Sequence, residues 1–499
     1  MRKRQILINA VMSVLRILVV SIVMVLLYKY LIGAIGAEKF GIWSLVMATT
    51  AVSQIAGFGL PVSVVKFVAK YIALKREDNV TEVIQTAFFS VGIFVGLILF
   101  IGYPIAKFWL KIVVAEAAYP DAIAILPYAL ITIWLFACSG VFQGGLDGFQ
   151  RIDAKSTLLM VGSFLNLGLC FLLVPGHGLM GVVYAGAIKN LIILISSWVL
   201  LKRELSSLPI IPYRWNKGLF REMIGYGTSC QVINVMIMFC DPITKAFLSK
   251  FGGLSIVGYY EMASKLVIQV RSLLVSANQV LVPAIADLKE KMPEKIQSVY
   301  STSYQLLFYL TVPLYAVLII SMPVISKLWI GHYETVFVVF GTLLALGWAL
   351  NTLAAPAYFA NMGIGDLRWN VISHIVTALL NVSLGFFLGT LYGGTGVAAA
   401  WMCALVIGSS MIYLSYHKYN KIPLNDLLPS SSRVLALVCL FFVVSGLFFS
   451  YKFRDTADLF SINLLMISLS LIIFVPFWMN PMRRRVIGWV TRDLLGKSQ

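Results

Sequence analysis

Chemistry in this chain would depend on cations that interrupt apolar segments. Seven lysines and arginines stand inside stretches that are otherwise long and apolar enough to cross a bilayer. An ionisable side chain in a membrane helix costs at least about 2.5–3.5 kcal/mol on insertion, so by default it faces the bundle interior or a hydrated cavity. The seven are Arg16, Lys29, Lys66, Lys189, Lys245, Lys265 and Arg271.

Three of these cations, Arg16, Lys189 and Arg271, have no acidic residue nearby in the sequence. Because an unpaired buried charge is costly, we expect them to line a wet cavity that an anion fills. The alternative is an acidic partner on another helix, or hydrogen bonds to broken backbone. Lys66 is placed either in this cavity or at the headgroups, whereas Lys29 is expected to reach the headgroups. We therefore predict a cationic cavity lined by Arg16, Lys66, Lys189 and Arg271, with arginine suited to phosphate.

The other two cations have acidic neighbours. Asp241 and Lys245 are four residues apart, as are Glu261 and Lys265, so each pair shares a helix face. The two helices form a hairpin that turns near 252–253, which brings Lys245 level with Glu261 and Asp241 level with Lys265. Two interpretations stay open: a salt-bridge network that holds the hairpin, or an ion-coupling site in which Asp241 or Glu261 binds a proton or sodium.

Composition predicts an integral membrane protein with all-α structure. Apolar residues make up 60% of the 499-residue chain and charged residues only 12%. A helix needs about 20 mostly apolar residues to cross a bilayer. About 14 such segments are present, separated by short loops: 10–32, 41–66, 83–106, 122–146, 156–174, 179–201, 224–249, 255–284, 301–325, 335–359, 370–391, 395–416, 434–451 and 459–480.

The positive charges lie mainly on one side of these segments. With the N-terminus in the cytoplasm, cytoplasmic segments hold about 25 Lys and Arg and the opposite side about 7. This asymmetry predicts both termini in the cytoplasm, in a multi-pass protein of the cell's inner membrane. The net charge of +18 therefore reflects topology and contact with anionic lipid, and no nucleic-acid partner is expected.

The chain repeats itself at a nearly constant spacing. Four short motifs each occur twice, in the same order and at offsets of 217, 217, 215 and 215 residues. They begin at residues 36 and 253, 148 and 365, 165 and 380, and 181 and 396. Such repeats are typical of secondary transporters, whose substrate site lies between the repeats. Six helices per repeat give two lobes in parallel orientation. We predict an N-terminal six-helix lobe over 1–201, a cytoplasmic connector over 202–223, a C-terminal six-helix lobe over 224–420, and two extra helices with a basic tail over 421–499.

Several motifs stand at the start of each half: Asn9-x-x-x-x-x-x-Arg16, Gly36-x-Glu38-x-Phe40-Gly41-Ile-Trp43, Gly57-Phe-Gly59-Leu, Asp241, Gly258-Tyr259-Tyr260 and Pro283-Ala-Ile-Ala286. Together they resemble the polysaccharide flippases of the multidrug/oligosaccharidyl-lipid/polysaccharide exporter superfamily. The resemblance implies two six-helix lobes around a central cationic cavity. It also implies alternating access that carries a polyprenyl-diphosphate-linked oligosaccharide from the inner to the outer leaflet. In related flippases, arginines on the first, second and eighth helices engage the diphosphate. Arg16 and Arg271 match the positions on the first and eighth helices, whereas the second helix here has Lys66 in place of an arginine in mid-span.

Other classes fit the sequence less well. A drug or organic-cation antiporter of the same superfamily would need an acidic cavity, and only Asp241 and Glu261 favour it. An enzyme is not expected, because His177, His332, His374 and His417 form no acid–base constellation. No repeated loop resembles a channel filter. No metal or cofactor is predicted, since the six cysteines form no ligand pattern. The expected partners are a lipid-linked anionic glycan, membrane lipid and a proton or sodium ion, and the expected state is a monomer.

Overall fold

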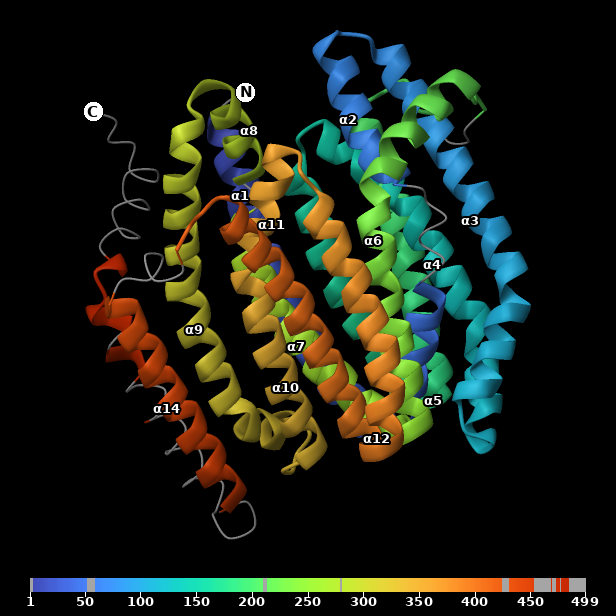
Figure 1. The fold of residues 1–499 in the computed structure, drawn as a ribbon. Coiled ribbons are helices and arrows are strands. Elements are labelled where there is room, and N and C mark those ends of the chain that lie inside the picture. Colours follow the sequence, from blue (N-terminus) through green and yellow to red (C-terminus); the bar gives the residue numbers. More distant parts are fainter. Residues whose placement is uncertain are drawn as a thin grey trace. The chain divides into compact units, whose positions relative to one another are not determined.

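The computed structural model describes residues 3–51, 59–209, 213–278, 281–423, 430–452, 468, 473–475 and 477–483. All regular secondary structure in these ranges is helical, which confirms the all-α prediction (Figure 1). The helices of the first half are α1 (Lys3–Ala51), α2 (Leu60–Ala73), α3 (Glu77–Val113), η2 (Glu116–Ala118), α4 (Tyr119–Gly148), α5 (Ile152–Glu204) and α6 (Lys217–Gly252). Those of the second half are α7 (Leu254–Asn278), α8 (Leu281–Lys291), η3 (Pro293–Lys295), α9 (Ile296–Trp329), α10 (Thr335–Leu353), α11 (Ala355–Ile364), α12 (Arg368–Tyr419) and α14 (Ser430–Lys452).

Three helices are too long for a single membrane crossing. With a rise of about 1.5 Å per residue, a helix of some 50 residues would be roughly 75 Å long, more than twice the hydrocarbon thickness. Each of the three contains a glycine with non-helical dihedral angles, at Gly36 in α1, Gly178 in α5 and Gly393 in α12. The predicted spans 156–174 and 179–201 therefore join in α5, and 370–391 and 395–416 join in α12. Seven of the described helices are long and apolar enough to span a membrane.

Two predicted spans are divided in the structure. The span predicted over 335–359 becomes α10 and α11, with a break at Ala354. Pro356, in the first turn of α11, has no N–H to continue the ladder of α10. The span predicted over 255–284 becomes α7 and the start of α8. Parts of the predicted spans 41–66, 255–284 and 459–480 lie outside the described residues.

The backbone repeats the duplication seen in the sequence. Gly36 has φ 80° and ψ 162°, and its counterpart Gly253 has φ 91° and ψ 166°. Gly178 has φ 53° and ψ −127°, and Gly393, which follows it by 215 residues, has φ 63° and ψ −146°. Positive φ of this kind strongly favours glycine. The same helix breaks thus recur at the spacing of the sequence repeat.

Two equivalent glycines, Gly41 of α1 and Gly258 of α7, pack against each other. A Cβ atom at Gly41 would overlap the carbonyl oxygen of Leu254, and a Cβ at Gly258 would lie 2.5 Å from the carbonyl oxygen of Ala37. The two contacts are related by the offset of 217 residues, since 37 corresponds to 254 and 41 to 258. The second half of α1 and the start of α7 therefore cross with local two-fold symmetry, at a distance that only glycine permits.

Alanine at Gly41 is expected to destabilise the protein by about 1–3 kcal/mol, because the methyl group would meet backbone that cannot rotate away. Thermal unfolding in detergent, followed by size-exclusion chromatography, would measure the change. Gly33→Ala is the matched control in the same helix, because a Cβ there meets nothing within 4 Å. Equal unfolding temperatures for the two variants would contradict the close crossing.

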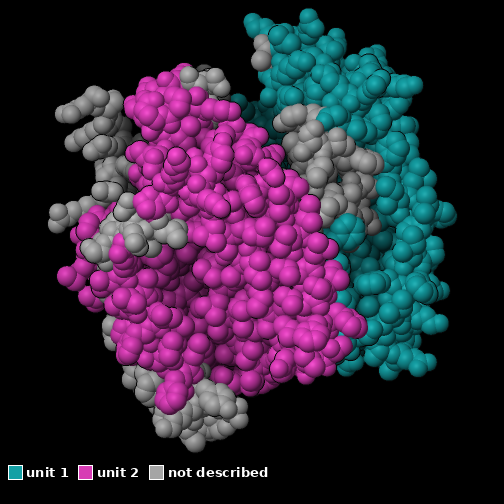
Figure 2. Space-filling view, in the orientation of Figure 1, with its two compact units in different colours: residues 1–261 teal, residues 262–499 magenta. Residues whose placement is uncertain are grey.

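The chain forms two compact units, residues 1–261 and 262–499 (Figure 2). The first unit includes α6 and the start of α7, because α6 packs against α1, α2 and α3. The two units are defined by contacts between residues, whereas the predicted lobes are defined by the sequence repeat. The boundaries of the lobes therefore stay a prediction.

The connector between α5 and α6 is bound to α3 by hydrogen bonds. The Gln85 side-chain oxygen accepts from the backbone N–H groups of Tyr213 and Arg214, at 2.9 and 3.1 Å. The Trp215 indole donates to the Ser90 hydroxyl at 3.0 Å, and the amide of Asn216 donates to Glu82 at 3.0 Å. Because α5 and α6 extend into the predicted connector of 202–223, the non-helical part is shorter than expected.

Candidate functional site

A buried ion cluster joins α6 to the start of α7. The Lys245 ammonium lies 2.8 Å from an Asp241 carboxylate oxygen and 2.7 Å from a Glu261 carboxylate oxygen. Lys245 and Glu261 are buried, whereas about half of the Asp241 side chain is exposed. The structure therefore has Lys245 beside Glu261, as the hairpin register expected from the sequence predicts. The same ammonium also binds Asp241.

Tyr28 is a fourth member of this cluster that the sequence analysis did not identify. Its hydroxyl, on α1, donates to the second carboxylate oxygen of Glu261 at 3.2 Å. Tyr28 is buried by edge-to-face contacts with the rings of Phe40 and Trp43. A signal was present, because Tyr28 and Lys245 are separated by the repeat offset (245 − 28 = 217). The cluster thus links α1, α6 and α7 through one buried glutamate.

Arg271, on α7, is held by neutral groups from α10. Its Nε donates to the Asn351 side-chain oxygen at 2.9 Å, and its guanidinium carbon lies 4.8 Å from the ring centre of Trp348. The Asn351 amide in turn donates to Ser409 of α12 at 2.9 Å. This chain of contacts fixes both the plane and the direction of the guanidinium.

Within the described part of the chain, Arg271 has no carboxylate partner, and its terminal nitrogens make no hydrogen bond. The side chain as a whole is half-buried. A positioned guanidinium whose two terminal nitrogens make no hydrogen bond to a described residue matches the oxygens of a phosphate or carboxylate. Trp348, Asn351 and Ser409 come from helices far along the chain, and no local pattern marked them in the sequence.

The other predicted cavity cations lie on three helices of the first unit. Arg16 is half-buried on α1, and Lys189 is half-buried on α5, next to the buried Asn190. Lys66, on α2, is exposed, with its ammonium 5.6 Å from the ring centre of Phe67. The structure thus places the four predicted cations on α1, α2, α5 and α7, and their common cavity stays a prediction. Lys265 is half-buried on α7, and its predicted role in coupling also stays a prediction.

Asn9, which begins the first family motif, has a structural contact. Its amide donates to the carbonyl oxygen of Gln150 at 2.9 Å, and its side-chain oxygen accepts from the N–H of Asp153 at 3.3 Å. Gln150 has φ 60°, so Asn9 satisfies polar groups at the tight turn between α4 and α5. Among the residues the structure describes, no group of His, Cys, Asp and Glu could hold a metal ion.

Residues 6–289, more than half of the chain, match the family described as polysaccharide biosynthesis protein. The chain belongs to this family. A curated relative, a putative O-antigen transporter of Shigella flexneri, is 21% identical over 398 residues, covering 78% of this chain and 92% of the relative. The resemblance drawn from the sequence motifs is therefore confirmed, and the chain is a multi-pass membrane protein of the polysaccharide biosynthesis family.

Two solved structures show the same fold as this family member. Lipid II flippase MurJ in an inward-closed conformation matches with a TM-score of 0.69 and 14% identity, over 98% of this chain and 100% of that chain. An inward-facing multidrug resistance transporter of the MOP superfamily matches with a TM-score of 0.67 and 14% identity, over 80% of this chain and 94% of that chain. At these identities the likeness concerns the fold. It fits a lipid flippase and a drug transporter alike, so the choice between them depends on the site.

Proposed function

We propose that this protein moves a polyprenyl-diphosphate-linked oligosaccharide from the inner to the outer leaflet of the inner membrane, for assembly of a cell-surface polysaccharide. The family, the O-antigen transporter and the fold shared with MurJ support transport of a lipid-linked glycan. Alternating access through a central cationic cavity, with both termini in the cytoplasm, is part of the proposal.

The observation that carries the proposal is the position of Arg271 and its lack of a carboxylate partner among the described residues. A half-buried guanidinium, fixed by Asn351 and Trp348 and without a carboxylate partner in the described part of the chain, is suited to bind an anion. The diphosphate is the group of a lipid-linked glycan that crosses hydrocarbon least readily, because its charge must be desolvated. Arg271 would replace part of its hydration, and Arg16, Lys66 and Lys189 would add positive potential along the path.

The alternative is an ion-coupled antiporter of drugs or organic cations. It is favoured by the fold shared with the multidrug transporter and by the two acids, Asp241 and Glu261. In the structure both carboxylates already bind Lys245, and Glu261 also accepts from Tyr28. The acidic groups are therefore engaged by a cation of the protein, whereas Arg271 has no carboxylate partner in the described part of the chain. This difference favours an anionic substrate.

A headgroup series would test the proposed substrate class. Purified protein in detergent would be titrated with three lipids of equal chain length: polyprenyl diphosphate, polyprenyl monophosphate and neutral polyprenol. The proposal predicts that affinity falls in that order, because each lost charge removes attraction to the fixed cations. Equal affinity for all three lipids, together with tighter binding of an organic cation, would support the antiporter instead.

A further inference from the structure

The hydrogen bonds around Arg271 form a chain, the Asn351 relay, in which every link has a fixed direction. The Ser409 hydroxyl donates to the backbone carbonyl of Leu405 at 2.7 Å, so its one proton is used. Toward Asn351 this hydroxyl only accepts, and the Asn351 amide nitrogen donates to it at 2.9 Å. The side-chain oxygen of Asn351 therefore points the other way, where the Nε of Arg271 donates to it at 2.9 Å. Both ends of the relay require the same orientation of the amide.

The partner that the relay gives to Arg271 is uncharged. Neither α10, which carries Asn351, nor α12, which carries Ser409, contains an aspartate or a glutamate. The other contact of the guanidinium, with the ring of Trp348, is also with a neutral group. An amide oxygen accepts from the Nε of arginine as a carboxylate does, but it leaves the positive charge uncompensated. Asn351 therefore holds the guanidinium in place without cancelling its charge.

An aspartate would fit the position of Asn351, because its side chain has nearly the same shape. Its second oxygen would face Ser409, whose hydroxyl can turn to donate to it. The Leu405 carbonyl would keep its helical partner, the N–H group four residues later. The relay would then end in an ion pair with Arg271, like the pair between Lys245 and Glu261. The choice of an amide over a carboxylate at position 351 thus decides whether the charge of Arg271 is compensated.

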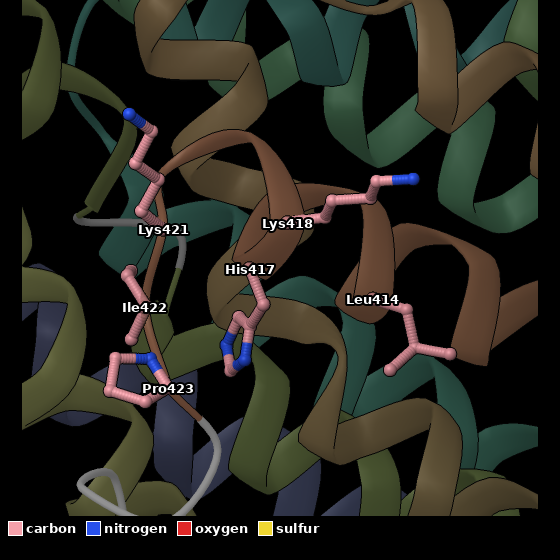
Figure 3. A pocket seen from close by; sticks show the side chains of 6 residues that line it. All are labelled: Leu414, His417, Lys418, Lys421, Ile422 and Pro423. Carbon is pink, nitrogen blue, oxygen red and sulfur yellow. The ribbon is translucent and has the colours of Figure 1, made fainter.

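A second group of cations, farther along α12, has no such order. It surrounds an open hollow of about 460 Å³ that is lined by Leu414, His417, Lys418, Lys421, Ile422 and Pro423 (Figure 3). In Figure 3 the side chains of Lys418 and Lys421 point away from each other and from His417. These lysines therefore do not converge on one ligand, whereas the guanidinium of Arg271 is directed by the Asn351 relay.

We propose that Asn351 is a specificity-determining residue of the proposed substrate site: its neutral amide positions Arg271 and leaves the charge of the guanidinium for an anionic substrate. A carboxylate at this position would pair with Arg271 and reduce the preference for a diphosphate. The inference rests on the proposed transport of a diphosphate-linked lipid, and it adds the residue that sets the charge at the site. Asn351 acts through Arg271, so it is a positioning residue and needs no contact with the substrate.

Binding of polyprenyl diphosphate to the purified full-length protein in detergent tests this role. Asn351→Asp should weaken binding about 10- to 100-fold, as much as Arg271→Ala, because the new ion pair compensates the charge of the arginine. In the Arg271→Ala background the same substitution should weaken binding no more than about threefold, since it has no cation to neutralise.

Asn420→Asp is the matched control for the added charge. The Asn420 amide donates to the Tyr416 carbonyl at 2.8 Å, at the end of α12. A carboxylate there does not meet Arg271, so binding of polyprenyl diphosphate should stay within about twofold of wild type.

Thermal unfolding without ligand tests the relay independently of the proposed function. Asn351→Asp should lower the unfolding temperature by about 3 °C more in the Arg271→Ala background than in wild type, because only wild type supplies a cation to the new carboxylate. Absence of wild-type binding, with this difference present, would confirm the relay but contradict the proposed function and the substrate role of Asn351.

Three other results would overturn the proposal. The first is an equal change in unfolding temperature with and without Arg271. The second is binding of polyprenyl diphosphate by Asn351→Asp within about twofold of wild type, or an equal loss of binding in the Arg271→Ala background. The third is a loss of binding in Asn420→Asp as large as that in Asn351→Asp.

Discussion

Replacing Arg271 with alanine is expected to slow flipping of a polyprenyl-diphosphate oligosaccharide roughly 10- to 100-fold, because a hydrogen bond to a charged group contributes about 1.5–3 kcal/mol. The loss should appear in the transport rate of reconstituted protein. Thermal stability should change little, since the arginine leaves no carboxylate unpaired among the described residues and its partner Asn351 keeps its bond to Ser409.

Two further variants make the Arg271 prediction specific. Arg271→Lys keeps the charge but loses the planar fork of donors, so its rate should lie between those of wild type and Arg271→Ala. Lys29→Ala removes an exposed cation from α1 and should leave the rate unchanged. If Arg271→Ala flips the lipid within twofold of wild type, Arg271 does not bind the diphosphate.

Replacing Lys245 with methionine is expected to destabilise the protein by about 3–5 kcal/mol, because it leaves the buried Glu261 carboxylate without its cation. The Tyr28 hydroxyl would remain as a donor but cannot neutralise the charge. Unfolding by denaturant or heat in detergent would measure the effect. Replacing Glu261 with leucine in the same protein should recover part of the loss, because the unpaired acid is then removed as well.

A surface ion pair of the same unit provides the control for Lys245. Lys70 lies 3.7 Å from Glu222, and both side chains are about half exposed. Lys70→Met should therefore change stability little, since exposed ion pairs contribute little. If Lys245→Met is as stable as Lys70→Met while transport loses its dependence on protons or sodium, the cluster is an ion-coupling site and not a structural network.

Much of the fold could be predicted because the membrane restricts it. Apolar length predicted the helices, and glycine spacing predicted the duplication that reappears in the dihedral angles of Gly36 and Gly253. The register of Lys245 and Glu261 followed from counting along a hairpin, which is a local problem. The break at Ala354 was missed because the apolar run continues across it, and only Pro356 indicated it.

The surroundings of the charged residues could not be predicted in the same way. Asn351 reaches Arg271 from a helix 80 residues away in sequence, and Ser409, which binds Asn351, is farther still, so no spacing rule connects them. Tyr28 is an uncharged aromatic residue in an apolar span, and only its separation from Lys245 by the repeat offset could have singled it out.

Flipping by the wild-type protein is the measurement that tests the central claim most directly. Proteoliposomes would carry a fluorescent polyprenyl-diphosphate oligosaccharide, and a membrane-impermeant reagent would report how much of it reaches the outer leaflet. We expect protein-dependent exposure that disappears when the diphosphate is replaced by a neutral linkage. No exposure above that of protein-free liposomes, alongside ion-driven uptake of an organic cation, would contradict the account and assign the protein to drug transport.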